Sequence, residues 1–174
     1  MHRYSIPAIA RHWMTALLIV CAFGLGLVMV DIPGITPTKL KYFSWHKWLG
    51  VTVLAVAVVR ALWRITHPAP ALPAGMPAWQ VKLAHLLHVL LYVLIFAIPV
   101  TGYFYSLAAG VPVVYLGLIP LPVLIEANEV WKPILKQVHY ALNMTLLACV
   151  VLHVGAAFKH LVIDRDGVFR RMLP

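Results

Sequence analysis

Four long apolar segments constrain the fold of this chain more than any other feature of its sequence. They cover residues about 6–30, 45–65, 79–106 and 131–162, and most of their charged residues lie near their ends. A helix needs about 20 mainly apolar residues to cross the hydrocarbon core of a bilayer, and each segment is long enough. We therefore expect a single transmembrane domain over residues 1–174, an all-α integral membrane four-helix bundle.

The composition excludes a water-soluble enzyme. Hydrophobic residues make up 63% of the chain and charged residues 11%, and the mean hydropathy is +0.90. Soluble domains are about 45–50% apolar and about 25% charged. Lys and Arg outnumber Asp and Glu by 14 to 5, which in a soluble chain indicates nucleic acid. Because these charges flank apolar segments, we read them as signals of membrane topology and expect no nucleic-acid partner.

The positive charges predict the orientation of the bundle, since Lys and Arg are enriched in cytoplasmic loops. With the N-terminus inside, nine of them fall on the inner side and five on the outer side, so both termini are predicted to lie inside. The first apolar run, 13–30, has about 18 residues against the usual 7–15 of a signal peptide, so we expect it to stay as a helix. Residues 107–130 are apolar but rich in Pro and Gly, and are predicted to form an interfacial or re-entrant excursion.

The nine histidines are the feature that needs a functional explanation, because ionisable residues within membrane spans mark functional sites by default. His139 and His153 are 14 residues apart in the last segment. On an α-helix this separates them by about 21 Å along the axis and about 40° around it. Two imidazoles on one face at two depths suit two stacked haem groups, one per leaflet, each with a second axial ligand from another helix.

Depth along the segments limits which histidines can pair. At the outer level, His46 is the one partner at the depth of His139. At the inner level, three histidines are candidates for pairing with His153, and depth does not choose between them: His12, His85 and His88. Beyond pairing, His85 and His88 also suit hydrogen-bonding support, contact with haem propionates or contact with quinone.

The remaining metal-binding chemistry of the chain is sparse. Its two cysteines, Cys21 and Cys149, form no Cys-x-x-Cys-His motif, which excludes covalent c-type haem. No Asp or Glu lies inside an apolar segment, whereas zinc sites usually add carboxylates or thiolates and proton relays usually contain a carboxylate. Imidazoles alone suit a site of low charge such as a bis-histidine haem.

Several short motifs carry a resemblance to a known family. They are AIARHW at 8–13, WHKWLG at 45–50, VVRALWR at 58–64 before a Pro-rich linker, and LAHLLH at 83–88, together with His139 and His153. The sequence resembles the bacterial cytochrome b561 family of small four-helix dihaem proteins of the inner membrane. The resemblance extends over almost the whole chain and implies a multi-pass protein of the bacterial inner membrane.

The resemblance implies roles for individual residues. His12 and His153 would ligate the inner haem b, and His46 and His139 the outer one. The best-known small bacterial type in the family is a superoxide oxidase that passes electrons from superoxide to ubiquinone. In that type a histidine seven residues after the last haem ligand lies near the quinone, and His160 holds this place here.

We therefore expect an enzyme, a superoxide:ubiquinone oxidoreductase with two non-covalent haem b groups and ubiquinone as the electron acceptor. Five lysines flank the outer haem ligands: Lys39, Lys41, Lys47, Lys132 and Lys136. Their positive charge would attract the superoxide anion to the outer haem. Alternatively, these lysines would contact lipid phosphates or haem propionates. On the inner side, three arginines are candidates for pairing with haem propionates: Arg11, Arg60 and Arg64.

Two other functions stay open from the sequence. One is a haem b membrane-anchor subunit that docks a dehydrogenase or hydrogenase, for which the apolar stretch 107–124 offers a partner surface. The other is a histidine-lined metal transporter without haem. An absorption spectrum of the purified protein distinguishes a haem protein from the transporter.

Overall fold

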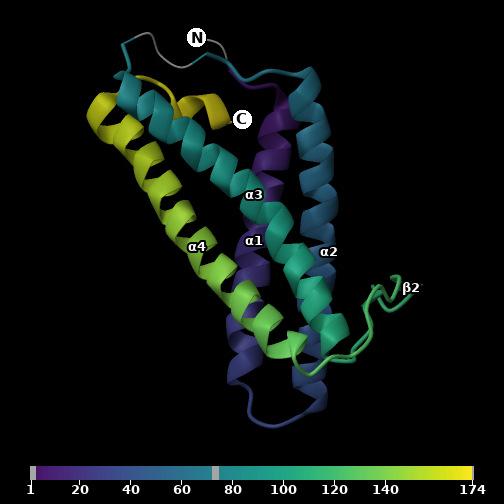
Figure 1. The fold of residues 1–174 in the computed structure, drawn as a ribbon. Coiled ribbons are helices and arrows are strands. Elements are labelled where there is room, and N and C mark those ends of the chain that lie inside the picture. The colour runs from purple at the N-terminus through teal and green to yellow at the C-terminus, as the bar shows by residue number, and fades with distance from the viewer. Residues whose placement is uncertain (1–2, 72–74, 174) are drawn as a thin grey trace.

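The computed structural model describes residues 3–71 and 75–173. Within these ranges the chain forms four long helices, α1 (Ile6–Asp31), α2 (Pro37–Thr66), α3 (Ala78–Ala108) and α4 (Trp131–Lys159), each apolar and long enough to cross a membrane (Figure 1). The all-α four-helix architecture predicted from the sequence is confirmed.

Helix α2 begins eight residues before the predicted apolar segment, at Pro37 instead of residue 45. The side chain of Thr36 caps the helix by accepting a hydrogen bond from the backbone N–H of Lys39 at 3.2 Å. Proline is well tolerated in a first helical turn, where its missing N–H has no partner in any case. The 30 residues of α2 span about 45 Å, so one end of this helix reaches beyond the hydrocarbon core.

The helices pack as two antiparallel pairs, α1 along α2 and α3 along α4, and α2 also contacts α3. Helix α1 begins and helix α4 ends at the same end of the bundle (Figure 1). The α1–α2 turn and the α3–α4 connection lie at the opposite end. We refer to these below as the inner and outer ends, following the predicted orientation.

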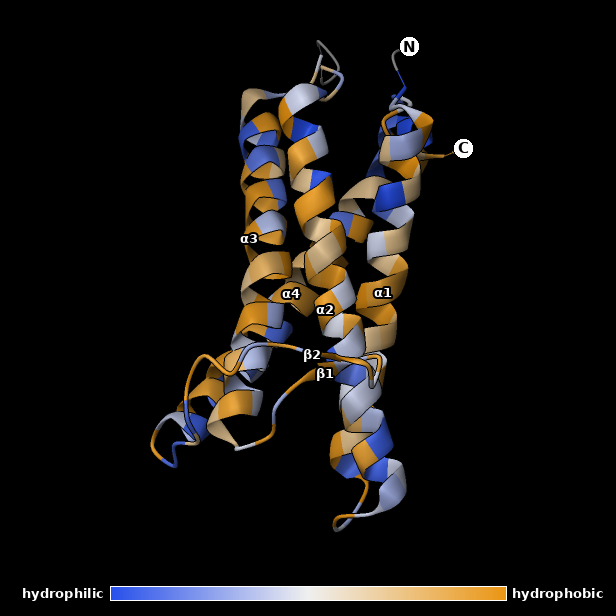
Figure 2. Ribbon diagram, turned by 90° about the vertical axis from the view of Figure 1, so that its right-hand side faces the viewer, coloured by the Kyte–Doolittle hydropathy of each residue, from blue (hydrophilic) through white to orange (hydrophobic). Residues whose placement is uncertain are grey.

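The exterior of the bundle is apolar. Large side chains such as Leu17, Val20 and Leu152 are about two-thirds exposed, and Figure 2 shows hydrophobic residues along the middle of the helices. A small core of Leu94, Leu146 and Cys149 packs α3 against α4. Lipid tails are as apolar as leucine, so an exposed apolar surface of this kind suits contact with the bilayer.

The connection between α3 and α4 contains a short hairpin and no fifth span. Strand β1 (Val114–Tyr115) pairs antiparallel with β2 (Ile119–Pro120). The hairpin lies against α2, where the indole of Trp48 donates to the carbonyl oxygen of Val114 at 2.8 Å. The predicted non-spanning excursion over 107–130 therefore takes this form. Its residues Leu107, Ala108 and Val113 are buried, whereas others, Leu118 above all, are exposed.

The C-terminal segment folds back over the inner end. Helix α4 continues into a π-helical turn, η1 (His160–Asp164), followed by a 3-10 helix, η2 (Phe169–Met172). The indole of Trp13 on α1 donates to the carbonyl oxygen of Met172 at 2.8 Å. This contact ties the end of the chain to its first helix.

Candidate functional site

Two pairs of histidines face each other inside the bundle. His46 of α2 and His139 of α4 have ring centres 6.2 Å apart, and His12 of α1 and His153 of α4 also have ring centres 6.2 Å apart. Helix α4 thus supplies one histidine to each pair, and two different helices supply the partners. The structure brings together the four histidines that the sequence analysis assigned to two levels.

The separation within each pair fits two imidazoles on opposite sides of one metal ion. With a metal–nitrogen bond of about 2.0–2.1 Å and about 1.1 Å from nitrogen to ring centre, two such rings are centred about 6 Å apart. Both observed separations of 6.2 Å match this value. The donor set is neutral nitrogen only, which suits a haem iron whose porphyrin already carries the charge.

The outer pair is held in the tautomer that a metal ligand needs. Nδ1 of His46 lies 2.9 Å from the carbonyl oxygen of Ala22, and Nδ1 of His139 lies 3.1 Å from that of Ile98. A carbonyl oxygen can only accept, so each Nδ1 carries the hydrogen and donates it. Each Nε2 is then left with the lone pair that binds a metal.

Two glycines make room for the outer histidines. A Cβ atom at Gly102 would lie 2.9 Å from Cε1 of His139, and one at Gly26 would lie 3.3 Å from Cε1 of His46. Any other residue at Gly102 would have to displace the imidazole. Sequence reasoning missed both glycines, because isolated glycines in an apolar helix give no signal of what they face.

A second histidine, His88, is also close enough to His153 to be considered as its partner. The ring of His88 on α3 is centred 5.3 Å from that of His153, closer than the 6.2 Å between His153 and His12. The shorter separation leaves less room for an intervening metal, and the separation from His12 fits better. His85 is exposed and its Nδ1 lies 2.7 Å from the carbonyl oxygen of Val81 on its own helix.

Arginines gather beside the inner pair. The guanidinium of Arg11 lies 4.1 Å from the ring centre of Trp63, and among the described residues the buried Nε and Nη2 of Arg11 and Nε1 of Trp63 have no hydrogen-bond partner. Buried donors without acceptors are costly, so these three atoms fit an acidic group such as a haem propionate. Arg60 donates to the Tyr92 hydroxyl at 3.1 Å, and Arg64 is exposed in the last turn of α2.

The five predicted outer lysines differ in their surroundings. Lys47, next to His46, is partly buried and lies 3.4 Å from the hydroxyl of Ser106. The other four lie nearer the outer ends of the helices: Lys39 donates to the carbonyl oxygen of Ile32, Lys41 lies over Trp45, Lys132 pairs with Glu129, and Lys136 is exposed. Lys47 therefore combines a place next to His46 in the chain with partial burial between α2 and α3.

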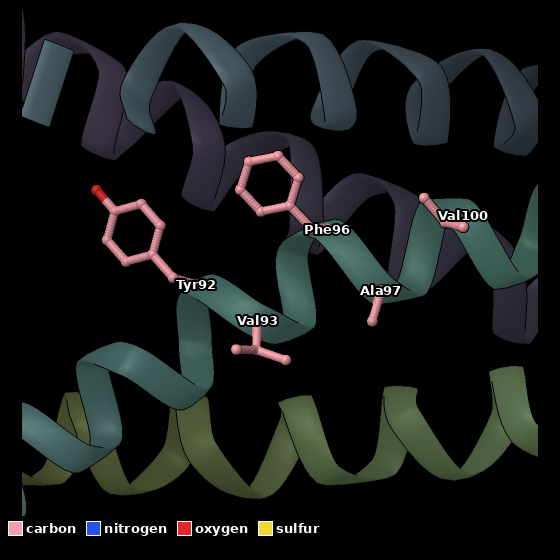
Figure 3. Close-up of a pocket in the computed structure, with 5 residues that line it drawn as sticks. All are labelled: Tyr92, Val93, Phe96, Ala97 and Val100. Carbon is pink, nitrogen blue, oxygen red and sulfur yellow. The ribbon is translucent and has the colours of Figure 1, made fainter. Parts of the chain in front are cut away.

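An apolar hollow of about 490 Å³ runs along α3 between the levels of the two pairs (Figure 3). It is lined by Tyr92, Val93, Phe96, Ala97 and Val100. These residues come after His88 and before Gly102 on the same helix, which places them between the inner and outer levels. The hollow is shallow, open to the exterior of the bundle and almost wholly apolar.

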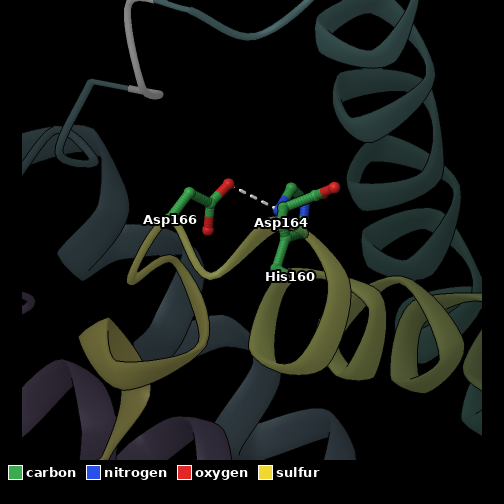
Figure 4. Close-up of side chains that lie close together, drawn as sticks. All are labelled: His160, Asp164 and Asp166. Carbon is green, nitrogen blue, oxygen red and sulfur yellow. Dashed lines mark hydrogen bonds and ion pairs between the residues drawn. The ribbon is translucent and has the colours of Figure 1, made fainter.

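His160 lies at the inner end, at the start of η1, and is held by two carboxylates that sequence reasoning did not single out. Its Nδ1 lies 2.7 Å from Oδ2 of Asp166 and 3.2 Å from Oδ2 of Asp164 (Figure 4). The spacing His-x-x-x-Asp-x-Asp was the available signal. Asp164 lies four residues after His160, and the left-handed residue Arg165 after η1 turns the chain so that Asp166 also reaches the ring.

The known proteins to which this chain is similar match it along almost its whole length. A family model described as prokaryotic cytochrome b561 matches residues 3–174. Cytochrome b561 homolog 2 of Escherichia coli K12 is 32% identical over 172 residues, covering 98% of this chain and 91% of the relative. Cytochrome b561 homolog 1 of the same strain is 27% identical over 174 residues, covering 100% and 98%. A probable superoxide oxidase, CybB, of Yersinia pestis is 28% identical over 179 residues, covering 100% and 98%.

Proposed function

Because this chain belongs to the prokaryotic cytochrome b561 family, and so is a membrane protein that binds haem b, we propose that it is a superoxide:ubiquinone oxidoreductase with two haem b groups. Electrons would enter at the outer end of the bundle and leave to ubiquinone at the inner end, in a bacterial inner membrane. The observation that carries the proposal is the pair of histidine sites with equal ring separations of 6.2 Å.

The chain's residues have distinct tasks in this proposal. His46 and His139 hold the outer haem, and His12 and His153 hold the inner one. Arg11 supplies buried donors to a propionate, with Arg60 and Arg64 contributing positive charge. When bound, the haems supply one-electron redox chemistry. The 14 residues between His139 and His153 separate the levels by about 21 Å along α4, so the two sites together reach across much of the membrane.

Superoxide as the donor is supported by two observations. One of the relatives is named a probable superoxide oxidase at 28% identity. In addition, Lys47 follows His46 in the chain, and its Nζ lies 3.4 Å from the hydroxyl of Ser106, one turn of α3 after the Gly102 that contacts His139. Its positive charge would favour a small anion near the outer pair. Ubiquinone as the acceptor is proposed for the inner end, where His160 follows His153 by seven residues.

A second function, a membrane-anchor subunit for a dehydrogenase or hydrogenase, is favoured by one observation. Residues 109–125 contain no charged side chain, and exposed apolar side chains cluster there, including Leu118, Val123 and Leu124. Exposed apolar patches often mark contact surfaces. In this case the patch would be covered by the partner subunit.

The experiment that distinguishes the two functions supplies purified protein in detergent with superoxide from an enzymatic source and a short-chain ubiquinone. We expect protein-dependent formation of ubiquinol, followed by its absorbance change, and expect superoxide dismutase to suppress it. Heat-denatured protein is the control for uncatalysed reduction. Wild-type protein that contains haem but forms no ubiquinol from superoxide contradicts the proposal and favours the anchor subunit.

Replacing Gly102 by Ala is expected to lower haem content by about half, because the added Cβ would lie 2.9 Å from the ring of His139 and would displace a ligand of the outer haem. Gly50→Ala is the matched control, since a Cβ at this position in α2 meets nothing within 4 Å. Haem per chain is measured from the absorption spectrum of the purified variants. Equal haem content in both variants would show that the outer haem does not depend on this close approach.

A further inference from the structure

The segment that follows α4 crosses the inner end of the bundle to the first helix. Helix α1 packs along α2 and helix α4 along α3, and among the described residues α1 and α4 have little direct contact. These two helices nevertheless supply His12 and His153, whose ring centres lie 6.2 Å apart. Figure 1 shows residues 165–173, which we call the C-terminal strap, running back from the end of α4 toward α1. The strap therefore connects the two helices of the inner pair.

Two contacts fix the start of the strap to the end of α4. The ring of Phe169 packs against that of Phe158, with ring centres 6.1 Å apart. Oδ2 of Asp166 lies 2.7 Å from Nδ1 of His160. The chain reverses between α4 and the strap because Arg165 adopts the left-handed conformation, with φ of 51°. The start of the strap thus has a defined position relative to α4.

The far end of the strap is fixed to α1 and to the segments beside it. The indole of Trp13 on α1 donates to the carbonyl oxygen of Met172 at 2.8 Å. The carbonyl oxygen of Arg171 accepts from the backbone N–H of Tyr4 at 3.4 Å. The guanidinium of Arg171 donates to the carbonyl oxygen of Ala71, in the connection between α2 and α3, at 2.6 Å. The strap therefore holds α1 at a set distance from α4.

The contact with Trp13 extends to a histidine of the inner pair. Trp13 follows His12 in the chain, and the two rings meet edge to face, with centres 5.4 Å apart and 80° between their planes. The indole cannot turn away from His12 without losing its hydrogen bond to Met172. The outer histidines are oriented by the carbonyl oxygens of Ala22 and Ile98. For His12, the fixed indole is a neighbour that limits the positions open to the imidazole.

We propose that the C-terminal strap positions His12 for haem binding through Trp13, and so holds the inner histidine pair at the separation that a haem iron requires. The proposal rests on the proposed function, in which His12 is a ligand of the inner haem. Trp13 is a positioning residue, since it acts through His12. The strap lies at the inner end, so the outer haem should be independent of it.

The test measures the binding of carbon monoxide to the reduced, haem-loaded protein in detergent. A haem iron with two histidine ligands has no free position, so carbon monoxide binds only as often as one ligand dissociates in a local opening. Trp13→Phe keeps an aromatic ring against His12 and removes the indole N–H. We expect it to raise the rate of carbon monoxide binding to one of the two haems about fivefold, the typical effect of losing one hydrogen bond. The other haem and the haem content should keep their wild-type values.

Three further variants make the result specific. Trp79→Phe is the matched control, because Trp79 is an exposed tryptophan near the start of α3 at the same end, and its rate should stay at the wild-type value. Phe169→Ala removes the contact with Phe158 that fixes the strap to α4, leaves α1 intact, and should raise the same rate. In a His46→Ala background, which should keep only the inner haem, the increase caused by Trp13→Phe should persist.

The outcomes separate the strap from the proposed function. If His12→Ala removes a haem and Trp13→Phe binds carbon monoxide at the wild-type rate, the strap proposal is wrong and the function stands. An equal increase at both haems shows that Trp13 has only a general structural role, and an increase without one in Phe169→Ala shows that the indole acts without the strap; each contradicts the proposal. If His12→Ala keeps two haems, the inner assignment of the proposed function fails and the strap proposal with it.

Discussion

His46→Ala and His139→Ala are each expected to leave the purified protein with one haem b in place of two. Each substitution removes one axial ligand of the outer pair, whose rings are centred 6.2 Å apart, and a single remaining imidazole holds a non-covalent haem poorly. The measurement is haem per chain, with the spin state from the absorption spectrum. Electron transfer from superoxide to ubiquinone should fall to the uncatalysed rate, because its entry site is lost.

The inner pair gives the complementary result. His12→Ala and His153→Ala should remove the other haem, and the exposed His85 serves as the matched control, since His85→Ala should retain both. His88 is the informative competitor, because its ring is centred 5.3 Å from that of His153. If His88→Ala removes a haem and His12→Ala does not, the inner assignment is wrong. Wild-type protein with one haem contradicts the two-site proposal altogether.

The helical architecture could be predicted because it depends on segment length and composition alone. A stretch such as 131–162 is apolar for longer than a bilayer is thick, and no soluble fold accommodates four of these in 174 residues. The relation between His139 and His153 could also be predicted, because both lie on one regular helix whose geometry is fixed.

Features that depend on contacts between helices could not be predicted in the same way. Depth left three candidates to face His153, and the packing of α1 against the rest of the bundle brings His12 to 6.2 Å from it. The role of Gly102 depends on which ring approaches it from α4. The contact between His160 and Asp166 depends on the left-handed residue Arg165, which follows the π-helical turn, and hydrophobic periodicity does not encode it.

The outer lysines show how structure refines a prediction made from composition. In the sequence, five lysines near the outer histidines are equivalent sources of positive potential. In the structure, Lys132 is paired with Glu129, and Lys39 donates to the carbonyl oxygen of Ile32. Lys47 is adjacent to His46 in the chain, is partly buried and lies 3.4 Å from the hydroxyl of Ser106, so we assign it the strongest influence on an approaching anion.

Raising the ionic strength is therefore expected to slow the reduction of the protein by superoxide about tenfold, since electrostatic attraction raises association rates by about 10-fold or more and is lost in salt. Reduction by a neutral quinol should change little, because it carries no charge to be attracted. Both rates are measured by following haem absorbance after rapid mixing or pulse radiolysis. The Debye length of about 30 Å at 0.01 M falls to about 3 Å at 1 M, so the ionic strength should be varied between these two values.

The variant Lys47→Gln tests the same electrostatic attraction of superoxide at a single residue. A unit charge about 4 Å from a second contributes about 1 kcal/mol in water, so loss of this charge should slow the superoxide reaction about fivefold at low salt and weaken its salt dependence. Lys82→Gln is the control, because Lys82 lies near the start of α3 at the inner end and should have no effect. A superoxide rate that responds neither to salt nor to Lys47→Gln shows that the lysines do not attract the donor. The exposed apolar segment 109–125 would then be the stronger indication of what this protein meets at its outer end, and the anchor-subunit function would be preferred.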